Sequence, residues 1–372
     1  SVAYKGKPEM GTFMREWVSL YESKSGERGI FNRKAAKKQA AKNGRRDAEQ
    51  DFGCNPCSEI ILRPYQFCNL SEVVVRASDT QQTLIDKVRL ATILGTFQST
   101  LTDFKYLRNV WKRNTEEERL LGVSLTGIMD NAMMSGKSTH LGNNIAATLN
   151  AFKEQAITTN EVISLQLGIP QSAAITCVKP SGTVSQLVDS ASGIHARHNP
   201  YYIRTVRGDN KDPLTQFMVS AGVPAEPDVM KPDSTTVFSF PMKSPHGAVT
   251  RFEMTAIEQL ELWLLYQRHW CEHKPSVTIS VKEHEWMEVG SWVYDHFDEV
   301  SGISFLPFSE HTYKQAPYQD CSVEEYGEML KKMPSKIDWT WLQDYEKEDT
   351  TSGGRELACT ADACEVVDLN AA

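Results

Sequence analysis

Apolar residues recur at helical spacing along three segments of the chain, and a short apolar run follows each segment. The helical segments are 143–168, 255–270 and 283–300, and the apolar runs are 173–178, 276–281 and 302–308. Helices of three or more turns that alternate with short strands are typical of parallel strands joined by crossover helices. The pattern therefore predicts an α/β domain.

Two further helices are predicted nearer the N-terminus. Residues 10–23 and 84–107 both space their apolar side chains at helical intervals. The residues expected near one face of the second helix are Leu84, Val88, Ala91, Leu94, Leu101 and Phe104. From residue 348 onward the chain is small, polar and glycine-containing, which is typical of a mobile tail. We therefore divide the chain into a helical, basic lead-in (1–50), an α/β region (51–347) and a flexible redox tail (348–372).

A basic stretch, "RKAAKKQAAKNGRR", covers residues 33–46 with seven basic side chains and no acidic one. One interpretation is a solvated helix of alanine and lysine. The other is a contact with phosphate or with a partner molecule.

Composition narrows the class of protein. A chain of 372 residues with 24% charged and 40% apolar residues is typical of a globular protein with a substantial core. The net charge of -8 argues against a general binder of nucleic acid or of membrane surfaces. No apolar run approaches the roughly 18 residues that span a bilayer, and the first residues lack the features of a signal peptide. We expect a cytoplasmic protein with neither DNA nor a membrane as partner.

Cysteine usage points to chemistry rather than to a disulfide framework, because eight cysteines are few for this length. Five of them fall in two groups, which are Cys54, Cys57 and Cys68, then Cys359 and Cys364. The isolated ones, Cys177, Cys271 and Cys321, are expected to be ordinary packing residues. Clustered cysteines in a cytosolic chain are more often metal ligands or catalytic thiols than bridges.

The first cysteine group fits either of two interpretations. Cys54, Cys57 and Cys68 could bind zinc, with a tail cysteine as the fourth ligand. Bulky apolar residues between Cys57 and Cys68 weigh against a small zinc knuckle. Glu59 lies two residues from Cys57, so on an extended segment both side chains face the same side. A carboxylate beside a thiol suggests a proton acceptor next to a reactive sulfur, and we assign no metal ligand.

A loop of small and hydroxyl residues, "KPSGTVSQ" at 179–186, lies between a predicted strand and a predicted helix start. Backbone N–H groups at such a position attract an anion, and the helix dipole adds to the attraction. The loop matches neither of the usual nucleotide motifs. Phosphate binding and a plain turn both explain its composition.

Two other groups of residues carry side chains that could take part in binding or redox chemistry. Segment 192–207 is either a polar loop that leads into a partly exposed strand or the wall of an anionic substrate pocket. Its candidate residues are His195, Arg197, His198, Tyr201, Tyr202, Arg204 and Arg207. The tail cysteines Cys359 and Cys364 are five residues apart, so they are either a pair for thiol–disulfide exchange or incidental surface thiols.

Taken together, these motifs resemble the C-terminal half of a ribonucleotide reductase large chain. The similarity is to the adenosylcobalamin-dependent class II type, in the monomeric triphosphate reductase branch of cyanobacteria and phages. The residues that carry it are "NPCSE", "FCNLSEV", "ITCVKPSGTVSQLVDSASGIHARHNPYYIRTVR", "CEHKPSVTISV", "GISFLPF" and "ELACTADACE". The resemblance implies the second half of a ten-stranded α/β barrel, with a finger loop at 54–70.

The resemblance also implies a role for each site residue. Cys57 is the transient thiyl radical that takes the 3′-hydrogen of the ribose, and Glu59 is the base at the 3′-hydroxyl. Asn55 holds the same region by hydrogen bonds. Cys68 is one of two thiols that reduce the 2′-position as water leaves.

The remaining implied features concern phosphate, reductant and cofactor. The substrate phosphates are bound by Pro180, Ser181, Gly182, Thr183, Val184 and Ser185. Cys359 and Cys364 re-reduce the active-site disulfide and receive electrons from a thioredoxin-like dithiol. Adenosylcobalamin is the cofactor, and the reaction converts ribonucleotides, as triphosphates, to 2′-deoxyribonucleotides for DNA synthesis.

The sequence departs from the family in what it lacks. The family's partner for Cys68 and its allosteric specificity segments belong to an N-terminal half that is absent here. We therefore expect the chain to be inactive without that half, which comes from the same precursor, through an intein, or from a split gene. Cys54 has no implied catalytic role and is expected to pack. Two alternatives are a class I type chain with a metal-radical partner subunit and a non-catalytic or zinc-stabilised remnant.

Overall fold

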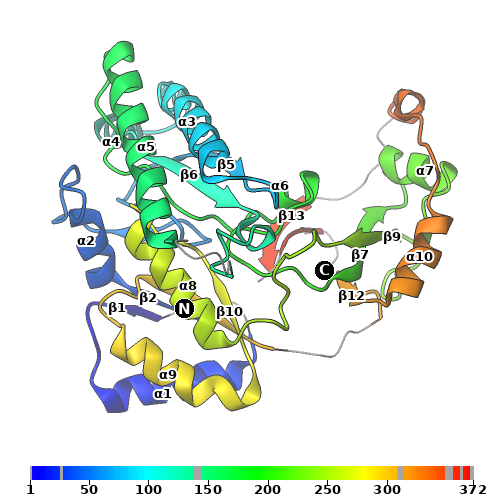
Figure 1. The fold of residues 1–372 in the computed structure, drawn as a ribbon. Coiled ribbons are helices and arrows are strands. Elements are labelled where there is room, and N and C mark those ends of the chain that lie inside the picture. The colour runs from blue at the N-terminus through cyan, green and yellow to red at the C-terminus, as the bar shows by residue number, and fades with distance from the viewer. Residues whose placement is uncertain are drawn as a thin grey trace.

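The computed structural model describes residues 2–25, 28–137, 144–308 and 314–347, and the backbone of two strands at 355–360 and 363–368 (Figure 1). Its main feature is a set of parallel strands in a layer beside helices. These strands are β5 (Asn69–Val74), β6 (Leu121–Thr126), residues 174–178, β10 (Thr278–Val281) and β11 (Gly302–Pro307). None of the described helices is long and apolar enough to cross a bilayer.

The five strands lie side by side in the order of the chain. β5 pairs with β6 in parallel, and parallel bridges join Val123 to Thr176 and Val178 to Pro275. β10 then pairs in parallel with β11. The chain therefore has the α/β class and the five-stranded half-barrel that the sequence predicts.

Two strands of the lead-in extend this sheet. β2 (Gly29–Asn32) pairs antiparallel with β11, and β1 (Val2–Tyr4) pairs in parallel with β2. The sequence prediction had treated 1–50 as helical, so it missed both strands. Among the described residues β1 pairs only with β2 and β5 only with β6, which leaves an open edge at each end of the series.

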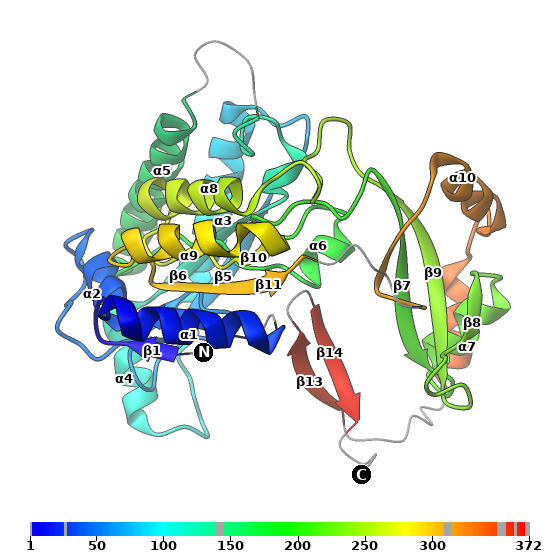
Figure 2. The same ribbon diagram turned by 90° about the horizontal axis from the view of Figure 1, so that it is seen from below.

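Crossover helices pack against one face of the parallel strands. Helix α4 (Asn109–Glu118), between β5 and β6, instead contacts residues 63–67 of the finger loop. The helices that lie against the strands are α3 (Gln81–Gln98), α5 (Ile145–Leu167), α8 (Ala256–His269) and α9 (Trp286–Asp295). Apolar side chains from these helices and strands form the large core cluster. Helix α1 (Met10–Ser23) lies beside α9 in both views (Figures 1 and 2), where Trp17 Nε1 donates to the Trp286 carbonyl at 3.0 Å.

Most of the predicted helices are confirmed. Helix α1 has the predicted bounds, and α5, α8 and α9 fall within the segments 143–168, 255–270 and 283–300. The three apolar runs after these segments contain the strands 174–178, β10 and β11.

The prediction for 84–107 is wrong in its second half. Helix α3 ends at Gln98, and of the residues expected on its buried face Leu94 is 64% exposed and Leu101 is 72% exposed. The buried face instead continues from Leu84 and Val88 through small residues. Thr92 and Thr96 satisfy their hydroxyls by donating to carbonyls one turn earlier, so polar residues fit the close contact with α5.

The basic stretch forms helix α2 (Arg33–Ala41), which is not simply a solvated helix. Its alanine side is buried, and Asn32 caps its first turn. Beyond the helix, Arg45 and Arg46 pair with Glu272 and Glu118 of this same chain. The two arginines are therefore used within the fold.

A second, antiparallel sheet lies apart from the parallel strands (Figure 2). Its order is β12-β7-β9-β8, and segment 192–207 leads into β7 as a partly exposed strand. The bounds are β7 (Tyr201–Asp209), β8 (Ala225–Pro227), β9 (Thr235–Lys243) and β12 (Tyr318–Asp320). Helices α7 (Pro213–Ser220), α10 (Val323–Lys332) and α11 (Leu342–Tyr345) accompany it. No periodic pattern in the sequence had predicted this sheet.

The tail contains two strands that were not predicted. β13 (Arg355–Thr360) pairs antiparallel with β14 (Ala363–Asp368), and the register sets Cys359 opposite Cys364. The other tail residues, and all tail side chains, lie outside the described part of the chain.

Candidate active site

The finger loop begins as a narrow hairpin. β3 (Gly53–Cys54) pairs antiparallel with β4 (Ile61–Leu62), and a tight turn joins them. The Ser58 N–H donates to the Asn55 carbonyl at 2.9 Å, and the Ile60 N–H donates to Asn55 Oδ1 at 2.9 Å. The Asn55 side chain therefore closes the turn that carries Cys57.

The extended geometry expected around Cys57 is wrong. Ser58 has φ +68°, in the left-handed region, so the chain reverses between Cys57 and Glu59. Cys57 is half-buried, whereas Glu59 is fully buried at 0% exposure. The alternation argument for a shared side therefore does not apply, because it holds only for a strand.

The turn is held by two residues of the segment 273–276, Lys274 and Ser276. The Ser276 hydroxyl donates to the Cys57 carbonyl, and Lys274 Nζ donates to Ser58 Oγ at 2.7 Å. The Lys274 N–H also donates to the Glu59 carbonyl at 3.0 Å. These contacts tie both sides of Cys57 to the segment that leads into β10.

His273 joins the hairpin to β6. Burial lowers the pKa of His273 to about 3, so the ring is neutral. The Ile61 N–H donates to Nδ1 at 3.3 Å, which leaves the ring proton on Nε2 to donate to the Leu121 carbonyl at 2.9 Å. One buried ring thus bridges β4 and β6.

Two glycines leave room for the finger loop. A Cβ atom at Gly122 of β6 would lie 2.4 Å from Leu70 Cδ2 and 3.0 Å from Ile60 Cδ1. A Cβ atom at Gly302 of β11 would lie 2.5 Å from Ser58 Oγ. The loop therefore packs directly against the strands on both sides.

Glu59 has the least satisfied polar group of the site. Neither carboxylate oxygen has a hydrogen-bond partner among the described residues, although the side chain is fully buried. Buried carboxylates normally have such partners. Glu59 is therefore free to bind a hydroxyl group of a ligand.

Glu72 is a second carboxylate of the interior, and the sequence analysis did not select it. Its register partner on β6 is Ser124. Burial raises the pKa of Glu72 to about 7, opposed by Ser181, Lys179 and Ser124 and supported by the charge of Glu59. The signal in the sequence was one glutamate inside the apolar strand "NLSEVV".

Cys68 directly precedes β5 and, like Leu62 of the hairpin, packs against the buried cluster of Leu120, Ala173 and Ala174. Burial raises the pKa of its thiol, and the negative charge of Glu59 raises it further. The thiol form is therefore favoured at neutral pH. Cys54 pairs with Ile61 in the hairpin, and none of the six described cysteines is in a disulfide.

The loop 179–186 follows the strand 174–178, as the sequence predicts, and ends in the short helix α6 (Val184–Leu187). In Figure 1 α6 lies near the arrowhead of β6. Ser181 is buried and its Oγ lies 2.8 Å from Thr126 Oγ1, while the Lys179 N–H donates to Ser124 Oγ at 2.9 Å. Within the described part of the chain the N–H groups of Gly182 and Thr183 have no acceptor. The groups that shift the pKa of Glu72 include Ser181 and Lys179 of this loop and Glu59 of the finger hairpin, so the loop and the hairpin share one interior.

The arginines of segment 192–207 have partners within the chain. Arg197 is buried and makes a bidentate pair with Asp130 at 2.8 and 2.9 Å. Arg204 lies over the Tyr318 ring, and Arg207 pairs with Asp228. This arrangement favours a structural role over the predicted wall of an anionic pocket.

Metal binding by the first cysteine group gains no support. In the described residues no three His, Cys, Asp or Glu side chains gather as metal ligands. The side chains of the tail cysteines Cys359 and Cys364 lie outside the described part of the chain.

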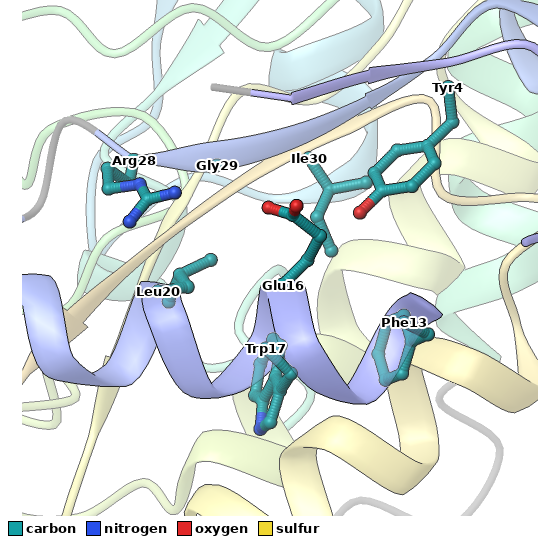
Figure 3. A pocket seen from close by; sticks show the side chains of 8 residues that line it. All are labelled: Tyr4, Phe13, Glu16, Trp17, Leu20, Arg28, Gly29 and Ile30. Carbon is teal, nitrogen blue, oxygen red and sulfur yellow. The ribbon is translucent and has the colours of Figure 1, made fainter. Parts of the chain in front are cut away.

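Two pockets lie away from the finger loop. The pocket in Figure 3 lies between α1 and β2. Glu16 points from α1 into its middle, with Arg28 on one side and Tyr4 on the other, and its free volume of about 10 Å³ suits one water molecule. The other lies between α2 and the end of α8, has a free volume of about 350 Å³ and is lined in part by Lys42, Arg268 and Glu299. Neither contains a residue of the predicted site.

Known proteins similar to this chain are ribonucleotide reductases. The adenosylcobalamin-dependent ribonucleoside-triphosphate reductase of Euglena gracilis is 28% identical over 344 residues, which are 90% of this chain and 45% of that protein. The probable enzyme of the same name from Dictyostelium discoideum is 29% identical over 86% of this chain and 41% of its own length. The Levilactobacillus brevis enzyme is 26% identical over 77% of this chain and 41% of its own length. This chain spans less than half the length of these curated relatives, and no family model matches it.

Solved structures agree on the fold. A B12-dependent class II ribonucleotide reductase matches with a TM-score of 0.73 at 22% identity, over 94% of this chain and 51% of that chain. The α subunit of the class Id ribonucleotide reductase of Actinobacillus ureae matches with a TM-score of 0.54 at 11% identity, over 80% of this chain and 61% of that chain. The fold is that of about half of a ribonucleotide reductase catalytic chain. The chain is related to the adenosylcobalamin-dependent ribonucleoside-triphosphate reductases, as the sequence motifs indicate.

Proposed function

We propose that this chain is the part of a class II ribonucleotide reductase that carries its radical site, and that the assembled enzyme reduces ribonucleoside triphosphates to 2′-deoxyribonucleotides. The observation that carries the proposal is the finger-loop turn. It carries Cys57 two residues before Glu59, a fully buried carboxylate with no hydrogen-bond partner among the described residues. A closed interior also protects a reactive intermediate from side reactions.

Each residue of the turn has a proposed role. Cys57 takes the 3′-hydrogen of the ribose as a thiyl radical, and Glu59 accepts the proton of the 3′-hydroxyl. Asn55 closes the turn and holds this region. Cys68 donates reducing equivalents at the 2′-position. Its raised pKa keeps a proton on the sulfur, and this proton is available to the 2′-hydroxyl as it leaves as water.

The loop Pro180–Ser185 is proposed to bind the substrate phosphates. The N–H groups of Gly182 and Thr183, which have no acceptor among the described residues, suit anionic oxygens. Lys179 adds a positive charge beside them. A protonated, uncharged Glu72 would not repel a polyanionic substrate. Its pKa of about 7 means that a large fraction of Glu72 is protonated at neutral pH.

Adenosylcobalamin is the proposed cofactor, because the relatives carry it in their names. When bound, it supplies the homolysis that generates the radical. Cys57 fits this chemistry because the residue is half-buried, whereas Glu59 is fully buried. This chain's own task is to hold the thiol and to exclude water.

An N-terminal part of the reductase is the proposed partner. The resemblance calls for ten barrel strands, and the described part of this chain has seven in one series: β1, β2, β5, β6, the strand 174–178, β10 and β11. The open edges of β1 and β5 are suited to pair with the missing strands. That part would also bring the second thiol for Cys68.

Reduction of the active-site disulfide is proposed for the tail. The antiparallel register of Cys359 and Cys364 is compatible with an exchanging pair, which a thioredoxin-like dithiol would re-reduce. The unbridged state of the six described cysteines fits the cytoplasm, where thiols stay reduced.

The proposal is tested with the chain assembled with its N-terminal part, adenosylcobalamin, a nucleoside triphosphate and a dithiol. We expect 2′-deoxynucleotide product without any second radical subunit. The substitution Cys57→Ser should lower turnover by about 10³-fold or more, because serine forms no comparable radical. Cys321→Ser, directly after β12 of the second sheet, is the matched control and should retain turnover.

Two results would overturn the assignment. Turnover retained in Cys57→Ser would remove the proposed radical residue. Turnover that needs a metal-radical subunit and ignores adenosylcobalamin would instead support the class I type of chain.

A further inference from the structure

Lys274 is a fully buried lysine at the finger loop, and no role has been assigned to it. Its exposure is 0%, its Nζ donates to Ser58 Oγ at 2.7 Å, and its N–H donates to the Glu59 carbonyl at 3.0 Å. The two bonds reach the residues on either side of the chain reversal. Among the described residues, Lys274 alone donates hydrogen bonds to both Ser58 and Glu59.

The surroundings of the ammonium group leave little space for water. The Phe31 ring lies 4.8 Å below Nζ, and a Cβ atom at Gly302 would come within 2.9 Å of it. Among the described residues no carboxylate lies within ion-pair distance of Lys274. A buried ammonium in such a place is unfavourable for folding unless it is compensated.

The compensation comes from the finger loop. Burial lowers the pKa of Lys274 to about 8, while the charges of Cys54 and Glu59 oppose that shift. Glu59 is itself buried and has no hydrogen-bond partner among the described residues. Each group therefore supplies the opposite charge that the other lacks, at a separation longer than a direct salt bridge.

We propose that Lys274 is a positioning residue for the finger-loop turn. Its ammonium group holds Ser58 by a hydrogen bond, and its charge keeps the unpaired carboxylate of Glu59 inside the barrel. Ser58 needs such support because its φ of +68° is unfavourable for a side chain other than glycine or asparagine. Loss of the contact would free Cys57 to move with the turn. The placement of the turn does not depend on the proposed function, but its consequence for turnover does.

The first experiment measures the reactivity of Cys57 in this chain without any cofactor. Iodoacetamide labelling is followed by peptide mass spectrometry in the wild type and in Lys274→Met, Lys274→Gln and Ser58→Gly. Cys321 serves as the internal reference for each sample. Lys282→Met is the matched control, because Lys282 follows β10 and lies over the Phe308 ring rather than at the turn.

We expect Lys274→Met to raise the labelling rate of Cys57 about 10-fold relative to Cys321, because an unheld turn opens more often. Lys274→Gln keeps a hydrogen-bond donor and should recover part of this protection. Ser58→Gly removes the acceptor and relieves the positive φ, so it should give an intermediate rate. Lys282→Met should match the wild type. Circular dichroism and the thermal midpoint report whether each variant is folded.

The second experiment measures turnover in the assembled enzyme. Lys274→Met should lower kcat with KM almost unchanged, since phosphate binding is untouched, and Lys274→Gln should restore part of kcat. A folded Lys274→Met chain with wild-type labelling of Cys57 would overturn the positioning role. Increased labelling together with an inactive wild-type assembly would leave Lys274 as the support of the turn and would instead refute the proposed reductase function.

Discussion

Glu72 is the carboxyl group of the barrel interior whose protonation changes near neutral pH. It faces Ser124 across β5 and β6, and its pKa of about 7 lies well above the ordinary value of 4.5. The cause is burial, which disfavours the charged form. Substrate phosphates and Glu72 would therefore be in conflict only above neutral pH.

Replacement of Glu72 by Gln should change how stability depends on pH. Between pH 4.5 and 7 the native state retains a proton on Glu72 that the unfolded state has lost, so this group's contribution to stability falls as pH rises. The lost contribution is at most about 3 kcal/mol. Urea unfolding at pH 5 and pH 8 measures the free energy of unfolding of both proteins. Relative to the wild type, Glu72→Gln should be more stable at pH 8 than it is at pH 5.

The exposed Glu161 on α5 provides the control, and Glu161→Gln should track the wild type at both pH values. A difference between Glu72→Gln and the wild type that stays constant from pH 5 to pH 8 would contradict the raised pKa of Glu72.

At the scale of elements, the finger hairpin and β6 are in direct contact at Gly122. Gly122→Ala should destabilise the chain by about 1–3 kcal/mol, because its Cβ would overlap Leu70 and crowd Ile60. Denaturant unfolding measures the change. Gly327 in α10 is the matched control, since a Cβ there meets nothing within 4 Å.

Gly327→Ala should stabilise the chain by about 0.5–1 kcal/mol, because alanine favours a helix over the unfolded state. Equal effects of the two alanine substitutions would mean that neither Leu70 of β5 nor Ile60 of the hairpin packs closely against Gly122.

An element could be predicted from the sequence where apolar spacing determines its structure, and could not be predicted where other contacts do. Helices α1 and α9 bury apolar side chains along one face, so spacing alone predicted them. Helix α3 buries Thr92, Gly95 and Thr96, so its true face has no apolar periodicity. The turn at Asn55–Ser58 was read as extended because a positive φ at a serine has no sequence signal.

At the scale of the whole molecule, the series of strands from β5 to β1 has two open edges. The N–H groups of Asn69 and Val75 bond toward β6, so the alternate amides of Leu70, Glu72 and Val74 point to the open edge. We expect hydrogen exchange at these three amides to slow when the N-terminal part binds. Ser71 and Val73, whose amides already face β6, provide the control within the same strand.

Residue-resolved deuterium exchange with and without the N-terminal part measures this effect. Uniform slowing along β5 would indicate general stabilisation rather than strand pairing, and no change would place the partner elsewhere.

The sequence by itself determined the alternation of helices and strands, the α/β class, and the identity of the motif residues Asn55, Cys57 and Glu59. These features depend on local periodicity or on residue types at a given spacing, and both can be read along the chain. Tertiary structure alone decided that His273 and Lys274 support the finger loop from more than 200 positions away, with sequence separations of 212 and 216 residues. It also decided that Glu72 shares the interior with Glu59, and that β1 and β2 extend the sheet. Contacts of this kind arise from burial and from close packing of distant segments, which leave no periodic trace in the residues that make them.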